Sequence, residues 1–162
     1  MAKRQISIQP MDAASFASFG DVLTLKSKPD KMINQDMCGR HHDLAKLDFT
    51  DGQAGISLFD AVPRQLPYTL DMMERHPLGS QAFIPLHEHG FLVIVAPDMD
   101  GKPGEPLAFL TAPGTGINIY KNTWHGVLTP LQAPGMFAVI DRIGNGANLE
   151  EYWLDEEYII QK

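Results

Sequence analysis

The segment ERHPLGSQAFIPL, residues 74–86, places three polar side chains directly before an apolar stretch. Its first residues end a predicted strand, Tyr68–His76, in which alternate side chains share a face. One face then carries Tyr68, Leu70, Met72, Glu74 and His76, and the other carries Thr69, Asp71, Met73 and Arg75. The first face begins apolar and ends in a carboxylate and an imidazole. This pattern is typical of an interior face that opens into a pocket, although a strand end that reaches solvent gives the same pattern.

Most of the chain consists of short apolar runs separated by Gly and Pro. We expect strands at Gln5–Gln9, Asp21–Leu25, Leu44–Phe49, Gly55–Ala61, Tyr68–His76, Ser80–Leu86, Phe91–Pro97, Leu107–Thr111, Gly116–Tyr120, Trp124–Leu128 and Met136–Asp141. Residues Met11–Phe19 are predicted to form a short helix capped by Asp12, and residues 26–40 a long loop. The acidic segment Glu150–Glu157 fits either a last strand or a short amphipathic helix. Many short strands indicate a β-sandwich or barrel, which we expect to form one domain over residues 1–162.

The composition limits the partners and the compartment. The formal net charge is −7, which disfavours nucleic acid as a partner because phosphate binding needs a basic surface. The single cysteine, Cys38, has no partner for an intrachain disulfide, so we interpret it as an inert thiol of a reducing compartment. We find no apolar segment typical of a secretion signal, and the longest apolar run, Phe91–Ala96, is too short to span a bilayer. We therefore expect a cytoplasmic protein without a membrane partner.

A second segment, YKNTWHGVL at residues 120–128, places His125 at the start of an apolar strand. Together with Glu74, His76 and Gln81, it resembles the two sequence motifs of the cupin family. The metal-binding members of that family usually have three histidines and one glutamate at these positions, whereas this chain has Glu first and Gln third. The resemblance implies a site for a divalent metal, nickel or another, formed by Glu74, His76, Gln81 and His125. An amide is a weaker ligand than a carboxylate, so we expect the ion to be held less tightly.

A closer resemblance extends over nearly the whole chain. The segment at 74–86, NTWH at 122–125, IDR at 140–142, FASFGDVL at 16–23, IN at 33–34 and HDL at 42–44 are similar to hallmark segments of the ureidoglycolate lyase family. The resemblance implies an all-β, cupin-like double-stranded β-helix or jelly-roll barrel, which commonly forms a homodimer. It also implies release of urea and glyoxylate from ureidoglycolate, a small anionic substrate, in the breakdown of purines through allantoin.

The residues suit that chemistry. Ureidoglycolate is a carbinolamide, so its C–N cleavage needs a base for the hydroxyl proton and an acid for the departing urea nitrogen. His76, His125 and Glu74 are the candidates, and the sequence does not assign the two roles among them.

The substrate also carries a carboxylate, which the paired donors of an arginine bind best. The candidate cations are Arg75, Arg142 and Arg40, with Lys121 as a further cation near His125. Simple alternation points Arg75 away from Glu74 and His76. Asn34 and Gln81 are predicted to contact the substrate as hydrogen-bonding partners.

Two other polar clusters have simpler interpretations. His87, Glu88 and His89 are predicted to form a solvated hairpin tip, with adventitious or lid-related metal binding as the alternative. Asp141 and Arg142 form either an ion pair that supports the pocket or a direct contact with the substrate.

Two other functions fit the same residues. One is a metal-dependent cupin isomerase or oxygenase that uses Glu74, His76, Gln81 and His125. The other is a non-catalytic cupin that binds a small acid, in which His76 and His125 hold the ligand without turnover.

Overall fold

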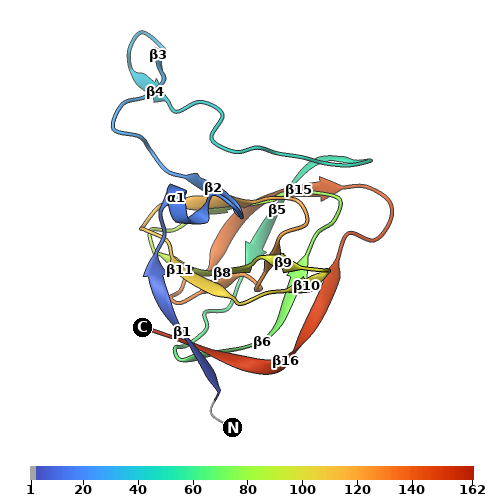
Figure 1. Ribbon diagram of the computed structural model, residues 1–162. Helices are drawn as coiled ribbons and strands as arrows, with labels where there is room; N and C mark the ends of the chain where they lie inside the picture. The colour runs from blue at the N-terminus through green and yellow to red at the C-terminus, as the bar shows by residue number, and fades with distance from the viewer. Residues whose placement is uncertain (1–2) are drawn as a thin grey trace.

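The computed structural model describes residues 3–162 (Figure 1). Its elements in chain order are β1 (Arg4–Pro10), α1 (Ala13–Phe16), β2 (Gly20–Leu23), β3 (Lys31–Ile33), β4 (Cys38–Arg40), β5 (Gln53–Asp60), β6 (Tyr68–Arg75), β7 (Gln81–Pro85), β8 (Phe91–Ala96), β9 (Asp98–Met99), β10 (Lys102–Pro103), β11 (Leu107–Leu110), β12 (Gly116–Ile119), β13 (Trp124–His125), β14 (Thr129–Pro130), β15 (Met136–Ile143) and β16 (Glu150–Gln161). The predicted class, mainly β with a short N-terminal helix, is confirmed. Among the described residues, no helix has the length and apolar character needed to cross a membrane.

Six strands close into a barrel. Their order is β11–β1–β16–β6–β13–β8, and an additional pairing of β11 with β8 completes the ring. All six strands contribute to one apolar cluster, so this cluster fills the barrel. Its buried members are Leu70, Met73, Leu92, Ile94, Ala96, Ala108, Trp124, Tyr158 and Ile160.

A five-stranded sheet, in the order β2–β12–β7–β15–β5, packs against the outside of this barrel. The second core lies between the two and contains Phe16, Phe19, Phe83, Phe91, Val93, Val95, Phe109, Ile117, Ile119, Phe137 and Val139. β8 contributes alternately to both cores, and all six of its residues are buried. This explains why its sequence, FLVIVA, is apolar throughout and does not alternate.

The predicted strand Leu44–Phe49 is wrong, apart from a single bridge between Phe49 and Gly79. The segment instead crosses the outer face of the five-stranded sheet, held by side chains. The amide of Lys46 donates to Asp21, and its carbonyl accepts from Asn118. The segment is not a strand because its backbone groups form hydrogen bonds with side chains of the sheet rather than with a neighbouring strand.

Three other segments differ from the prediction or settle an open choice. The helix is only Ala13–Phe16, although Asp12 caps it as expected through the amide of Ser15. The segment Glu150–Glu157 is part of strand β16, which pairs with β1 and β6. The predicted strand at 124–128 is reduced to the two residues of β13.

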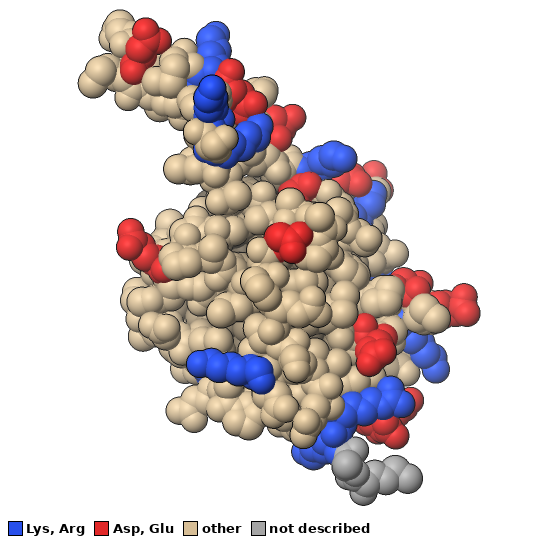
Figure 2. Space-filling view, turned by 60° about the vertical axis from the view of Figure 1, so that its left-hand side comes forward, with Lys and Arg blue, Asp and Glu red and all other residues tan. Residues whose placement is uncertain are grey.

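Residues 26–42 form a projecting arm rather than a simple loop. Within the arm, β3 pairs with β4 in a hairpin whose turn residues Asn34, Gln35 and Asp36 all have positive φ. Figure 1 shows the arm extending from the side of the body where β2 and β15 lie. In Figure 2, acidic and basic side chains crowd the arm, while one broad face of the body carries few of them.

Candidate active site

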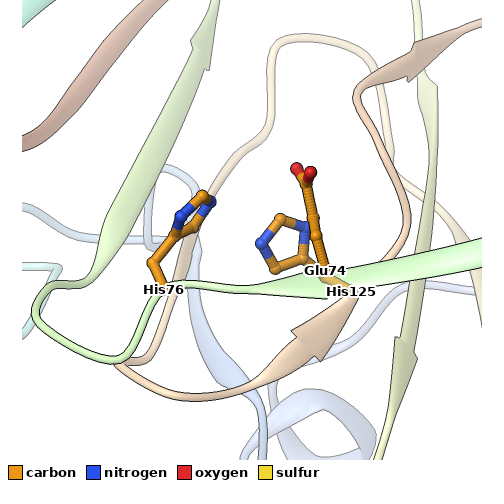
Figure 3. A group of neighbouring side chains, drawn as sticks. All are labelled: Glu74, His76 and His125. Atoms are coloured by element: carbon orange, nitrogen blue, oxygen red, sulfur yellow. The ribbon is translucent and has the colours of Figure 1, made fainter. Parts of the chain in front are cut away.

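Glu74, His76 and His125 form a compact cluster (Figure 3). One potential ligand atom from each residue lies within 4.8 Å of the others. The register places His125 on β13 beside Glu74 on β6 and beside Val95 on β8. Because Val95 belongs to the core between barrel and sheet, Glu74 and His125 face that same space. His76 follows directly after β6.

The prediction that Leu70 and Glu74 lie on the same face of strand β6 is wrong. Leu70 and Met73 both lie inside the barrel, three positions apart. The pairing of β6 with β16 shifts register between Trp153 and Tyr158, and this irregularity reverses the alternation. Glu74 therefore faces away from the barrel interior, toward the second core.

Hydrogen bonds fix the tautomers of both histidines. His76 Nδ1 lies 2.7 Å from the carbonyl oxygen of Asn148, and His125 Nδ1 lies 2.9 Å from that of Gly126. A carbonyl only accepts, so each ring carries its proton on Nδ1. Each Nε2 then presents a lone pair, and both Nε2 atoms are buried without a hydrogen-bond partner. The ring centroids lie 5.2 Å apart.

Burial shifts the titration of the cluster. It lowers the pKa of His125 to about 4, with a further lowering by the nearby His76. Burial also raises the pKa of Glu74, against the opposing effect of His76. Both shifts favour uncharged side chains, so the site holds a neutral His125 and a carboxyl group that protonates more readily than usual.

Gln81 and Asp141 face the same space from the opposite sheet. Gln81 lies on β7 two residues before Phe83, and Asp141 lies on β15 two residues after Val139, so both share the inward face. Gln81 Nε2 donates to Asp141 over 3.2 Å, which leaves Gln81 Oε1 buried and without a partner. Glu74, His76 and His125 are therefore brought together, and Gln81 faces the same core from β7.

The predicted cations are engaged elsewhere in the chain. Arg75 contacts Glu150 through Nε at 2.6 Å and Asp98 through Nη1 at 2.9 Å, and its guanidinium stacks 4.4 Å from the centre of the Trp124 ring. It points away from the cluster, as alternation predicted. Lys121 pairs with Asp48 at 3.0 Å.

Arg142 does not form the suggested ion pair with Asp141. Its Nε donates to the carbonyl of Thr50 over 2.6 Å, and Nη2 donates to those of Asp51 and Asn145. The side chain is buried, and these hydrogen bonds connect the loop at residues 50–51 with the loop at Asn145.

Asn34 and Arg40 lie exposed on the arm, apart from the cluster. Among the predicted substrate contacts, Gln81 is the residue whose side chain faces the same core as Glu74 and His125. The contacts of Arg75, Arg142, Lys121, Asn34 and Arg40 with a substrate stay predictions.

Reasoning from the sequence missed Asn148, which fixes His76 from a loop far along the chain. Its carbonyl accepts from the His76 ring, and its side-chain oxygen accepts from the amide of Leu78 over 2.7 Å. The Gly- and Asn-rich segment around it looks like any surface turn. The motif next to His76 offers no clue to this distant partner.

The histidines at 87–89 do not form a hairpin tip. They connect β7 of the five-stranded sheet to β8 of the barrel. The ring of His87 packs edge-on against Phe137, with centroids 4.8 Å apart, and burial lowers its pKa. His87 and His89 are not part of the cluster of Glu74, His76 and His125.

The cluster fits a divalent metal ion. Two imidazole lone pairs, a carboxylate and an amide oxygen are a donor set that first-row divalent ions accept. Backbone carbonyls already orient both imidazoles, as is usual for metal-binding histidines. The unpartnered Nε2 atoms and Gln81 Oε1 are the atoms that an ion would satisfy.

A closed β-barrel with this cluster beside its wall defines a cupin-like protein with a candidate metal or acid–base site. The sequence model of the ureidoglycolate lyase family matches residues 3–161. The chain therefore belongs to the ureidoglycolate lyase family, as its motifs predicted.

Individual relatives agree with the family match. A protein named ureidoglycolate lyase from Rhodobacter capsulatus is 58% identical over 158 residues, which are 97% of this chain and 98% of the relative. Ureidoglycolate lyase 2 from Rhizobium meliloti is 49% identical over 96% of this chain and 97% of its own length. A ureidoglycolate lyase from Chelativorans is 47% identical over 97% of this chain and 96% of its own length.

Proposed function

We propose that this protein is a ureidoglycolate lyase, which cleaves ureidoglycolate to urea and glyoxylate. The observation that carries the proposal is the cluster of Glu74, His76 and His125, with two imidazole lone pairs directed into a buried site. Near full-length relatives that bear this name support the choice of substrate.

The proposed reaction needs two proton transfers. A base removes the hydroxyl proton of the substrate, a C=O bond forms, and the C–N bond breaks with its electron pair moving to nitrogen. An acid then protonates that nitrogen, and urea leaves. Nε2 of His76 is suited to the first role because it carries a lone pair and the ring is only half-buried. Glu74 is suited to the second because its raised pKa favours the protonated form.

His125 has a different part in this proposal. Its pKa of about 4 makes it a weak base but keeps its Nε2 lone pair available at neutral pH. It accepts a hydrogen bond from an N–H group of the substrate, since the single hydroxyl proton goes to His76, or it ligates an ion. Gln81 Oε1, held by Asp141, accepts from the N–H groups of the ureido moiety.

The residues that would hold a divalent metal are Glu74, His76, Gln81 and His125. When bound, the ion would supply positive charge for the substrate carboxylate, because Arg75 and Arg142 are engaged elsewhere in the single chain. Nickel is one candidate, and the donor set suits other first-row divalent ions as well. A chelator separates direct proton transfer by His76 and Glu74 from a reaction that needs the ion.

The test is incubation of the purified protein with ureidoglycolate, with and without EDTA, followed by measurement of urea, ammonia and glyoxylate. Equal amounts of urea and glyoxylate support the lyase. Ammonia in place of urea indicates an amidohydrolase. No turnover in metal-supplemented buffer contradicts the proposal and favours a binding protein or another cupin activity.

The wider setting belongs to the same proposal. We infer that the enzyme acts in the cytoplasm, in allantoin and purine breakdown, and as a homodimer. A free, exposed Cys38 is consistent with a reducing compartment.

A further inference from the structure

The strands that carry Glu74 and His125 hold a second pair of side chains on their other face. The register that sets His125 opposite Glu74 sets Trp124 opposite Arg75 one position along. Neighbouring residues of a strand face opposite sides, so Arg75 and Trp124 lie behind the cluster of Figure 3. The guanidinium of Arg75 lies 4.4 Å from the centre of the Trp124 ring, and Trp124 is only 2% exposed. This stacked pair therefore supports the two cluster residues from behind.

Asp98 binds both members of the stacked pair. Its Oδ1 accepts from Nε1 of Trp124 over 2.8 Å and from Nη1 of Arg75 over 2.9 Å. Asp98 follows shortly after β8, the strand that pairs with the other edge of β13 and places Ala96 beside Trp124. One carboxylate oxygen thus connects β6 and β13 with the chain that leaves β8, directly behind the cluster.

Asp98 is itself held in place by a tight hairpin. Its Oδ2 accepts from the amide of Gly101 over 3.2 Å, within the hairpin of β9 and β10. The turn residues Asp100 and Gly101 both have positive φ, as a two-residue turn of this kind requires. The hydrogen bonds from Trp124 and Gly101 lower the pKa of Asp98, so its carboxylate stays charged at neutral pH. Asp98 is therefore a fixed acceptor for both partners.

The backbone alone gives β13 little support. The strand is two residues long, and within residues 3–162 a single residue pair, His125 with Glu74, joins it to β6. Trp124 is the other residue of β13, and its side chain is buried in the barrel core. The N–H of a buried indole needs an acceptor, and Asp98 is that acceptor. The placement of the Trp124 ring therefore determines where His125 lies relative to Glu74.

We propose that Asp98 is a positioning residue of this enzyme, which keeps Glu74 and His125 in their working arrangement through Trp124 and Arg75. The inference rests on the proposed lyase function and assigns a role to a residue outside the cluster. Without the Asp98 carboxylate, the indole and the guanidinium lose their common partner, and β13 is free to move relative to β6. A small misplacement of reacting groups lowers the rate of reaction strongly.

The first experiment measures steady-state kinetics with ureidoglycolate. Asp98→Ala removes the acceptor, and we expect it to lower kcat about 30-fold while KM changes less than about twofold. KM is little affected because Gln81, on β7 of the other sheet, keeps its position. Asp98→Asn keeps an oxygen acceptor for Trp124, so its kcat should stay within about fivefold of the wild type. Glu105→Ala is the matched control, since it removes an exposed acid from the same part of the chain and should leave kcat unchanged.

The outcomes of this experiment are distinct. A kcat of Asp98→Ala close to that of the wild type overturns the proposal, and so does an equal loss in Asp98→Asn or in Glu105→Ala. A raised KM with unchanged kcat overturns it as well, because that result indicates a contact with the substrate. Thermal unfolding of each variant is recorded alongside, and we expect the midpoint of Asp98→Ala to fall by only about 3 °C because the side chain is partly exposed.

A milder variant tests whether Asp98 acts through the indole. Trp124→Phe keeps an aromatic ring for the core and for Arg75 but removes the N–H that Asp98 binds. We expect Trp124→Phe to lower kcat in the same way as Asp98→Ala. The double variant Asp98→Ala/Trp124→Phe should be little worse than Asp98→Ala alone, since both changes remove one interaction. Losses that multiply in the double variant overturn the proposed connection.

The last measurement needs no substrate. Protein with ¹⁵N-labelled histidine is treated with EDTA, and the ring signals of His125 are assigned with the variant His125→Asn. The wild type should show one set of signals with the proton on Nδ1, as the hydrogen bond to Gly126 requires. We expect these signals to broaden or double in Asp98→Ala and to stay sharp in Glu105→Ala. Unchanged signals in Asp98→Ala overturn the positioning role. A wild type without turnover whose His125 signals still respond to Asp98→Ala overturns the lyase function alone.

Discussion

His76 Nδ1 lies 2.7 Å from the backbone carbonyl oxygen of Asn148, although the two residues are far apart in the chain. This hydrogen bond sets the tautomer of His76 and directs its Nε2 into the cluster with Glu74 and His125. The side chain of Asn148 strengthens the arrangement, because its oxygen accepts from the amide of Leu78, just beyond His76. One residue thus holds both the ring and the backbone that follows it.

Replacement of Asn148 tests this arrangement. We expect Asn148→Ala to lower the free energy of unfolding by about 1 kcal/mol, because the amide of Leu78 loses its partner. Turnover should fall about tenfold with little change in KM, because the side chain that fixes the loop is lost and the Asn148 carbonyl then holds His76 less firmly. Asn145→Ala is the matched control, since Asn145 uses its backbone carbonyl to bind Arg142. An equal loss of kcat in both variants would indicate general loosening of the loop instead.

The low pKa of His125 predicts a loss of stability in acid. The unfolded histidine titrates near 6.5 and the folded one at about 4. Between these values the unfolded state binds more protons, so stability falls as the pH falls. In metal-free protein this should remove about 3 kcal/mol between pH 7 and pH 4. The raised pKa of Glu74 acts in the opposite direction, which makes a comparison of variants necessary.

The comparison uses urea unfolding at pH 7 and pH 5, after treatment with EDTA. His125→Asn keeps a donor for the Gly126 carbonyl but removes the titrating ring. We expect the wild type to lose about 2 kcal/mol more than this variant between the two pH values. His42→Asn, at an exposed position, should behave like the wild type. A wild type and a His125→Asn variant with the same pH dependence would contradict the proposed effect of burial.

The local motifs predicted much of the fold and the core of the site. Short runs such as FLVIVA identified the strands, and the motif around His76 placed the cluster residues. The long-range details were beyond the sequence, because they depend on pairing. The shift between β6 and β16 reverses the faces of Leu70 and Glu74, and no residue in either strand signals it. Likewise, the arm hairpin turns at Asn34, Gln35 and Asp36 without the glycine that usually marks such a turn.

A carboxylate at position 81 should strengthen metal binding. Gln81 offers an amide oxygen, and Gln81→Glu replaces it with a charged ligand of higher affinity. The new carboxylate would then lie beside Asp141, which now accepts from the Gln81 amide, and the two carboxylates would repel. We therefore expect Gln81→Glu/Asp141→Asn to bind nickel about tenfold more tightly than the wild type in calorimetric titration. Unchanged affinity in the double variant would place any bound metal away from this site.

Replacement of the arginines separates a structural role from a substrate contact. Arg142 donates to the carbonyls of Thr50, Asp51 and Asn145, so Arg142→Lys should leave some of these buried acceptors unpaired. We expect it to lower the free energy of unfolding by about 2 kcal/mol while KM for ureidoglycolate changes little. Arg75→Lys, which loses partly exposed contacts with Glu150 and Asp98 and the planar stacking on Trp124, should be milder. Thermal unfolding and steady-state kinetics on both variants provide the check. A strongly raised KM with unchanged thermal stability would identify that arginine as the group that binds the substrate carboxylate.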